Sequence, residues 1–182
     1  MTDLLARVTY SPIGLIRTPF TDPHGMPIQA SAAVGIRGRI ELDPALVEGL
    51  ADIEGFSHLT LLYHLHEMHA ARLTVIPFLD DQPHGIFATR APARPNPIGL
   101  STVRLVGVHG PTLEIEDVDI LDSTPLLDIK PYVPAFDQRT DVRIGWLVGR
   151  LDRLAEVQAD RRFSRKLPVL EADAAGDRPA DR

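Results

Sequence analysis

The sequence of 182 residues contains no cysteine. This absence excludes disulfide bridges and thiolate metal sites. No apolar run approaches the length of a membrane span, so we expect no association with a membrane. Residues 1–8 lack the apolar core of a signal peptide, and we therefore expect a cytoplasmic protein.

Common catalytic and nucleotide-binding motifs are also absent. The sequence has no Gly-x-Gly-x-x-Gly after a strand and no Walker A lysine loop. It has no Gly-x-Ser-x-Gly elbow and no His-Glu-x-x-His helix. Any cofactor is therefore expected in the loops of a different kind of fold. The net charge of −6 argues against a general nucleic-acid coat, although a local positive face remains compatible with it.

One stretch, residues 84–101, stands out for its stiffness and its charge. It carries three prolines within six residues, so it can form neither a helix nor a central strand. Arg90 and Arg94 lie on it, and no Asp or Glu occurs between residues 82 and 113. A rigid arginine-bearing loop suits an anionic or carboxylate-bearing ligand. A proline-rich connection with solvated arginines is the alternative interpretation.

The remaining pattern predicts many short strands and few helices, which is typical of a β-barrel or sandwich. We expect a mainly β protein built as a small single-sheeted β-barrel with a short helix and a C-terminal helix. The expected strands cover residues 8–18, 34–42, 56–66, 72–78, 85–89, 101–108, 112–120 and 142–148, with a hairpin at 109–111 and a loop-like stretch at 121–134.

Helix signals are limited to two places. Asp43 and Pro44 resemble an N-cap and a first helical residue, followed by a short helix to residue 50. Leucines at helical spacing predict a second helix near the C-terminus. We divide the chain into a barrel domain at 1–149, a C-terminal helix at 150–167 and a disordered tail at 168–182.

Four histidines fall within twelve residues: His58, His64, His66 and His69. On a strand, His64 and His66 share one face, and such a pair is half of a zinc or iron site. No acidic cluster on the same strand completes the site, so we expect no metal. His66 and Glu67 at a strand end are better suited to hydrogen bonding with a ligand or another chain.

A second group of polar residues lies between residues 122 and 134. Asp122, Ser123 and Thr124 can form a turn that directs backbone donors outward. Asp128 and Lys130 place a carboxylate and an amine on the same side of an extended segment. The arrangement suits either a salt-bridged loop or recognition of the amino-acid end of a ligand.

Four stretches together resemble the TsaA-like domain of the TrmO family, especially its short single-domain members. They are residues 12–20, 55–66, 85–101 and 122–132, and the resemblance extends over about residues 8–147. It implies a β-barrel methyltransferase that uses S-adenosylmethionine without a Rossmann fold, and a homodimer in which both chains build the pocket. It also implies methylation of N6 of N6-threonylcarbamoyladenosine beside the anticodon of tRNA.

The resemblance also implies roles for individual residues. The implied cofactor contacts are Gln29, Ala30, Ser31, His66, Glu67, Arg90, Leu100, Asp122, Ser123, Thr124 and Pro125. Arg94 and Asn96 are the implied contacts to a tRNA phosphate or the threonyl carboxylate. Asp128, Lys130 and Tyr132 are our candidates for orienting or deprotonating the acceptor nitrogen.

Two residues depart from the family pattern, and they bear on the cofactor contacts. Ser123 replaces a frequent glycine, which predicts backbone strain or a different backbone there. Glu67 replaces a glutamine found in some members. Longer members also carry a second C-terminal domain. These features keep open a methyltransferase for a small molecule and a non-enzymatic S-adenosylmethionine-binding module.

Overall fold

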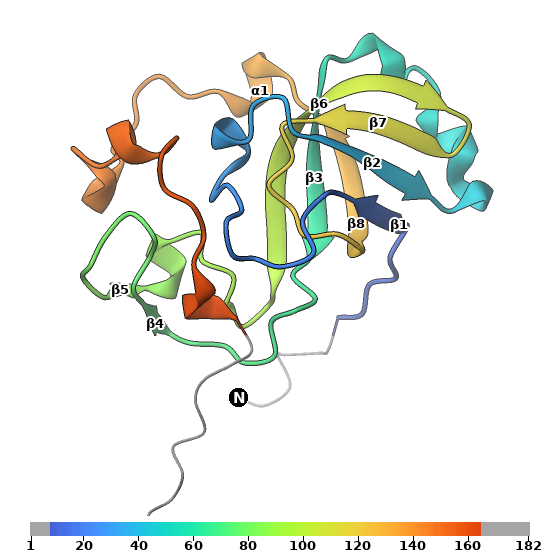
Figure 1. Ribbon diagram of the computed structural model, residues 1–182. Helices are drawn as coiled ribbons and strands as arrows, with labels where there is room; N and C mark the ends of the chain where they lie inside the picture. Colours follow the sequence, from blue (N-terminus) through green and yellow to red (C-terminus); the bar gives the residue numbers. More distant parts are fainter. Residues whose placement is uncertain (1–7, 165–182) are drawn as a thin grey trace, which may run out of the picture.

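A computed structural model describes residues 8–164, and its centre is a closed antiparallel barrel (Figure 1). Six strands close the barrel in the order β1-β2-β7-β6-β3-β8. Their bounds are Gly14–Arg17 (β1), Arg37–Leu42 (β2), His58–His64 (β3), Ile98–His109 (β6), Thr112–Glu116 (β7) and Thr124–Pro131 (β8). Closure pairs every barrel strand on both sides, which leaves the barrel sheet without a free edge. This architecture confirms the mainly β, single-sheeted barrel.

The alternation of side chains along β3 explains the barrel core. Leu59, Leu61 and Tyr63 are buried and point inward, whereas the residues between them are only partly buried. A strand with one face toward an apolar interior needs this two-residue period. The interior also contains Ile16, Ile40, Val103, Leu113, Ile115, Val118, Ile120 and Leu126. β3 is thus covered fully on its inner face only.

A second, smaller lobe lies beside the barrel. Its strands are β4 (Thr74–Val75) and β5 (His84–Gly85), and a 3-10 helix at Ile86–Ala88 follows them. Its separate core consists of Val75, Ile86, Ala91, Ala93 and Phe163. The expected strand at residues 85–89 is therefore mostly a 3-10 turn. The expected strand at 72–78 shortens to two residues.

Several local predictions are confirmed. The short helix is a 3-10 helix at Pro44–Leu50, and the side chain of Asp43 accepts a hydrogen bond from the Ala45 amide at 2.9 Å. β6 and β7 form the hairpin expected around residues 109–111. Shorter 3-10 helices lie at Ala30–Ala32 and Ile53–Gly55, and α1 covers Pro134–Asp137. No helix among residues 8–164 is long and apolar enough to cross a membrane.

Two differences concern the strand that closes the barrel. The loop-like stretch at 121–134 contains β8, which pairs with both β1 and β3. Residues 142–148, expected as the closing strand, instead hold a 3-10 helix at Gly145–Leu147. β8 escaped sequence analysis because its prolines and charged residues do not resemble a central strand. Pro125 and Pro131 lie near its two ends, and partner strands on both sides hold the segment extended.

The C-terminal part also differs from the expected helix at 150–167. Within the described residues it is a chain of short 3-10 helices, including Leu151–Arg153 and Arg161–Phe163. Figure 1 shows this segment passing beside the smaller lobe. It packs Phe163 into that lobe instead of pairing with another helix. Residues 165–167 and the expected disordered tail at 168–182 lie outside the described residues.

Candidate functional site

A hollow of about 300 Å³ lies between the 3-10 helix at Ala30–Ala32 and β6. Five residues with implied cofactor contacts line it: Gln29, Ala30, Ser31, Arg90 and Leu100. His58, Ser101, Thr102 and Asp117 complete the lining. The structure therefore brings together residues that are up to 88 positions apart in the sequence.

Two loops form walls of this hollow. Gln29 is the residue before the 3-10 helix at Ala30–Ala32, and Arg90 follows the 3-10 helix at Ile86–Ala88. The Arg90 guanidinium donates to the Gln29 side-chain oxygen at 3.3 Å, so the two loops meet across the hollow. Arg90 is exposed and lies in no ion pair within residues 8–164, which leaves its charge available to an anionic group.

Arg94 has a different environment from Arg90. Its guanidinium donates to the carbonyl oxygens of Thr89 at 2.9 Å and of Ile86 at 3.2 Å. Arg94 thereby stabilises the proline-rich loop, because its guanidinium has several N–H donors and can bind two carbonyl oxygens at once. Asn96, the other residue expected to contact the substrate, is exposed on the same loop. The structure does not place Arg94 and Asn96 among the residues that line the hollow.

A buried polar chain runs beneath the hollow. Ser101 donates to the Asp119 carboxylate at 2.6 Å, and the Tyr63 hydroxyl lies 2.9 Å from the Ser101 hydroxyl. Since the single Ser101 proton is used toward Asp119, Tyr63 is the donor to Ser101. Burial raises the pKa of the Asp119 carboxyl, while the Ser101 hydrogen bond and the Arg90 charge act in the opposite direction. Burial likewise raises the pKa of Tyr63, which keeps its hydroxyl protonated.

No local sequence pattern marks Tyr63, Ser101 or Asp119 as site residues. Tyr63 and Ser101 lie on strands β3 and β6, and Asp119 follows β7 between the buried Val118 and Ile120. An acidic residue between two buried apolar residues is the one available signal, because a buried carboxyl needs hydrogen-bond partners.

The other implied cofactor residues form a second group. His66 lies 3.3 Å from the Thr124 hydroxyl and 3.8 Å from Glu67. Asp122 accepts from the Thr18 amide at 3.1 Å, next to Ser123 and ahead of Pro125. Residues His66, Glu67 and Asp122–Pro125 do not line the hollow that holds Arg90. A single chain thus presents the implied cofactor contacts in two groups.

Ser123 does adopt the strained backbone that a glycine would favour. Its φ is 60°, in the left-handed region. Its hydroxyl accepts from Arg17 at 2.6 Å and donates to Asp122 at 2.7 Å. The Ser123 hydrogen bond is also the main cause that lowers the pKa of Asp122. Local hydrogen bonds therefore offset the strain, and the turn keeps the left-handed geometry at this position.

The candidates for acting on the acceptor lie on or just after β8. Asp128 and Lys130 form an ion pair of 2.7 Å between the carboxylate and the ammonium. The Tyr132 ring meets the edge of the His58 ring, with centroids 6.4 Å apart. His58 lines the hollow, and its Nδ1 lies 2.9 Å from the Ser57 hydroxyl. Tyr132 contacts the lining residue His58 but does not line the hollow itself.

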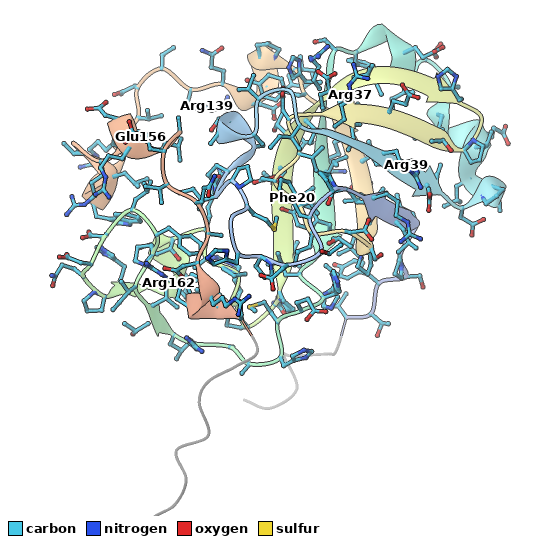
Figure 2. The ribbon with its side chains drawn as sticks, in the orientation of Figure 1. Phe20, Arg37, Arg39, Arg139, Glu156 and Arg162 are labelled. Carbon is cyan, nitrogen blue, oxygen red and sulfur yellow. The ribbon has the colours of Figure 1, made fainter. Side chains whose placement is uncertain are left out.

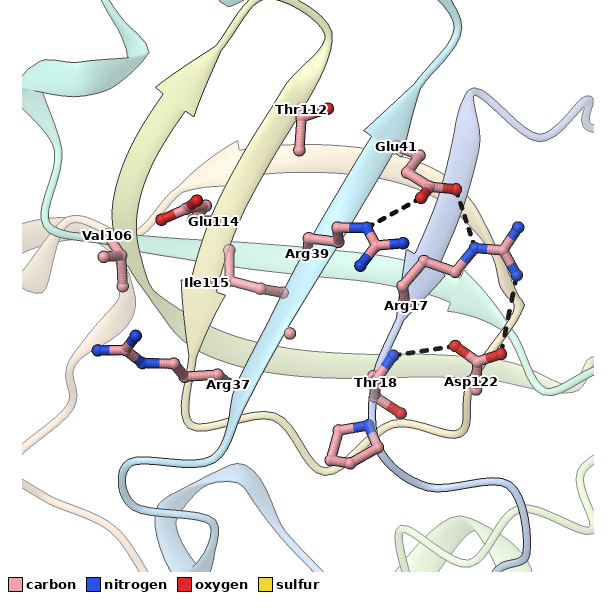
Figure 3. Close-up of a pocket in the computed structure, with 12 residues that line it drawn as sticks. Arg17, Thr18, Arg37, Arg39, Glu41, Val106, Thr112, Glu114, Ile115 and Asp122 are labelled. Carbon is pink, nitrogen blue, oxygen red and sulfur yellow. Dashed lines mark hydrogen bonds and ion pairs between the residues drawn. The ribbon is translucent and has the colours of Figure 1, made fainter.

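A larger hollow of about 610 Å³ lies on the outer face of β1, β2 and β7 (Figure 3). Arg17 bridges Glu41 at 2.9 Å and Asp122 at 3.7 Å, and Arg39 contacts the same glutamate. The Arg17 hydrogen bond is the main cause that lowers the pKa of Glu41. Acids therefore balance the arginines, and this hollow is not a positive surface.

The histidines do not gather with other possible metal ligands in the described part of the chain. Among residues 8–164 no group of three or more His, Asp or Glu side chains has an arrangement that would hold a metal ion. His58 and His66 instead have the hydroxyl partners described above, Ser57 and Thr124.

Comparison with known proteins decides the family. The family model of the tRNA-methyltransferase O N-terminal domain matches residues 15–138. The chain belongs to this family. A protein of Pyrococcus abyssi named "Probable S-adenosyl-L-methionine-binding protein" is 56% identical over 156 residues, which are 86% of this chain and 85% of that protein.

Other members of the tRNA-methyltransferase O family are longer. The crystal structure of TrmO from Pseudomonas aeruginosa superposes with a TM-score of 0.66 at 40% identity, over 78% of this chain and 63% of that one. The human tRNA (adenine(37)-N6)-methyltransferase is 34% identical over 140 residues, which are 72% of this chain and 31% of the human protein. This chain thus spans less than two thirds of these two relatives.

Proposed function

We propose that this protein binds S-adenosylmethionine and transfers its methyl group to a nitrogen acceptor. The observation that carries the proposal is the hollow that gathers Gln29, Ala30, Ser31, Arg90 and Leu100 in a chain of the tRNA-methyltransferase O family. The names of its relatives support S-adenosylmethionine as the cofactor. The chain offers this ligand one free guanidinium for a carboxylate, an amide for hydrogen bonding and an apolar side chain.

When bound, S-adenosylmethionine supplies an electrophilic methyl group on a sulfonium. The chain's own residues then have two tasks, to align the acceptor and to remove its proton. Alignment alone provides much of the rate in such in-line transfers. The Asp128–Lys130 ion pair and the Tyr132 hydroxyl are the groups we assign to orienting or deprotonating the acceptor nitrogen.

We propose N6 of N6-threonylcarbamoyladenosine in tRNA as the acceptor. The human relative's name supports adenine N6 in tRNA as the target in this family. A small-molecule acceptor is the second candidate, and the charge distribution favours it. A face that binds tRNA needs unpaired arginines, yet Arg17 and Arg104 lie in ion pairs and Arg94 binds carbonyls.

A homodimer is the third part of the proposal. The implied cofactor contacts form two groups in one chain, so a second copy would complete the site. Leu100 lines the hollow yet is 50% exposed, and Ile98 beside it is 41% exposed. Sedimentation of the wild type and of an Ile98→Glu variant tests this: we expect a dimer that the variant dissociates. A monomeric wild type would contradict it.

Calorimetric titration with S-adenosylmethionine tests cofactor binding. We expect the Arg90→Ala variant to bind at least tenfold more weakly, because a charge-assisted hydrogen bond to a carboxylate contributes about 1.5–3 kcal/mol. Arg139→Ala is the matched control, since the exposed Arg139 donates only to the neighbouring Gln138 carbonyl, at 2.9 Å. No binding by the wild type would refute the cofactor assignment.

Methyl transfer to tRNA with and without threonylcarbamoyladenosine tests the acceptor. With the wild type, we expect labelled methyl only on the modified tRNA. With Asp128→Asn, we expect slower transfer at unchanged affinity for S-adenosylmethionine. If Arg90 is the one arginine at the hollow that meets a phosphate, the logarithm of tRNA affinity should fall against that of salt concentration with a shallow slope of about −1. Absence of transfer to any tRNA would favour the small-molecule acceptor.

A further inference from the structure

The segment at residues 145–163, here called the strap, lies outside the part of the chain that the family model matches. In Figure 1 it runs, in orange and red, from the upper left of the molecule down beside the smaller lobe. It joins no strand of the barrel. Its contacts instead converge on the two loops that carry Gln29 and Arg90.

The strap fastens the first loop by backbone hydrogen bonds. The Ala159 amide donates to the Met26 carbonyl at 2.8 Å, and the Gly25 amide donates to the Ala159 carbonyl at 2.8 Å. Pro27 and Gln158 complete an antiparallel bridge. Gln29 follows two residues after this bridge, so the position of the strap sets where the Gln29 wall begins.

The strap fastens the second loop by side chains. The Trp146 indole donates to the Ala88 carbonyl at 2.8 Å, two residues before Arg90. The same indole stacks on His84, with ring centroids 4.5 Å apart and planes 21° apart. Arg150 pairs with Asp80 at 3.1 Å, and that carboxylate also contacts His84 at 3.0 Å.

The end of the strap is anchored in the smaller lobe. Phe163 is 9% exposed and meets Phe78 edge to face at a centroid distance of 5.3 Å. Arg162, labelled in Figure 2, donates to the Pro77 carbonyl at 2.8 Å. Its guanidinium lies over the Phe78 ring. The strap is thus held at its far end by burial, and not only by exposed hydrogen bonds.

We propose that the strap is a positioning element of the cofactor site, with Trp146 as its main positioning residue. The Arg90–Gln29 contact of 3.3 Å spans the two loops, and each loop is fastened to the strap two residues before its site residue. Loosening the strap lets the two walls move apart and lowers the fraction of molecules that can bind. This inference rests on the proposed cofactor function.

Three variants of the full chain test the strap. Trp146→Ala removes the stack and the indole donor, while Trp146→Phe keeps a stacking ring and removes only the donor. Val148→Ala is the control, because Val148 lies on the strap with 67% of its surface exposed. The readouts are the Kd of S-adenosylmethionine and amide hydrogen exchange at residues 25–33, 86–94 and 98–109.

For Trp146→Ala we expect faster exchange in both loops and unchanged exchange in β6. If the competent fraction falls to about a tenth, the apparent Kd rises about tenfold. Trp146→Phe should fall between this variant and the wild type, and Val148→Ala should match the wild type.

The inference is overturned if Trp146→Ala binds as tightly as the wild type. It is also overturned if exchange increases at residues 86–94 only, or if β6 loses protection equally. A wild type that does not bind S-adenosylmethionine refutes the cofactor function. In that case amide hydrogen exchange still tests the strap: faster exchange in Trp146→Ala at both residues 25–33 and 86–94 shows that the strap holds both loops, and faster exchange in only one of them shows that it does not.

Discussion

The packing of Tyr63 against Gly99 allows a quantitative prediction about the support of the site. A Cβ atom built on Gly99 would lie 2.7 Å from the Tyr63 Cδ2 atom and closer still to Cε2 and Cζ. Tyr63 is 6% exposed, and its hydroxyl is tied to Ser101 at 2.9 Å. The ring therefore has no free direction in which to retreat without breaking the polar chain to Asp119.

The cost of Gly99→Ala follows from these two effects. Overpacking of a well-packed interior costs about 1–3 kcal/mol. Loss of the Tyr63–Ser101 hydrogen bond, if the ring moves, adds about 0.5–1.5 kcal/mol. We therefore expect Gly99→Ala to lower the free energy of unfolding by about 1.5–4.5 kcal/mol, measured by urea unfolding.

A double-mutant cycle separates the steric cause from a general effect of alanine in β6. In a Tyr63→Leu background the clashing ring is gone, so Gly99→Ala should cost less than about 1 kcal/mol. Gly107→Ala is the control on the same strand, because its Cβ would meet only His109 Nε2, at an ordinary 3.5 Å. An equal cost of Gly99→Ala in both backgrounds would refute the reasoning.

Three further predictions concern single residues. Ser123→Gly relieves about 1–3 kcal/mol of left-handed strain but loses hydroxyl hydrogen bonds of about 0.5–1.5 kcal/mol each, so urea unfolding should show a net change within about 1 kcal/mol; a change above about 2 kcal/mol contradicts this. Phe163→Ala should lower the free energy of unfolding by about 3 kcal/mol, and in amide hydrogen exchange the amides at residues 86–94 should lose protection first. Full protection of these amides contradicts this prediction. The pKa of Asp119 is raised by burial, so its stabilising contribution is complete below its ordinary value of about 4 and is lost as pH rises through the raised value. In unfolding experiments the wild type should therefore lose stability relative to Asp119→Asn as pH rises above about 4, and a difference that does not change with pH contradicts this.

The barrel strands that alternate in sequence were predictable, and the strand that closes the barrel was not. β2 and the β6–β7 hairpin follow from periodicity and turn residues, which are local properties. β8 is held by β1 on one side and β3 on the other, more than sixty residues away from β3. Its prolines and charges satisfy local loop criteria, so only the long-range pairing decides its structure.

The C-terminal segment shows the opposite error, because a local helical pattern was overridden. Leu151 is 42% exposed, although the helical spacing of leucines predicted a buried stripe. Phe163 and Trp146 instead bind the smaller lobe, and the backbone of Ala159 pairs with the loop at residues 25–27. Ordinary residues differ in helical propensity by only a few tenths of a kcal/mol each. Burial of one phenylalanine side chain contributes about 1.5–3 kcal/mol, so tertiary packing can override a local helical preference.

Residue types alone predicted only part of the site. The free charge on the proline-rich loop was visible in the sequence, yet sequence alone did not distinguish its two arginines. Arg94 turns back to carbonyls of its own loop, whereas Arg90 crosses to Gln29. That division needs the fold, because it depends on a loop sixty residues earlier. It also explains why a stiff loop suits this position: Arg94 holds the loop's shape, and Arg90 is left to meet the ligand.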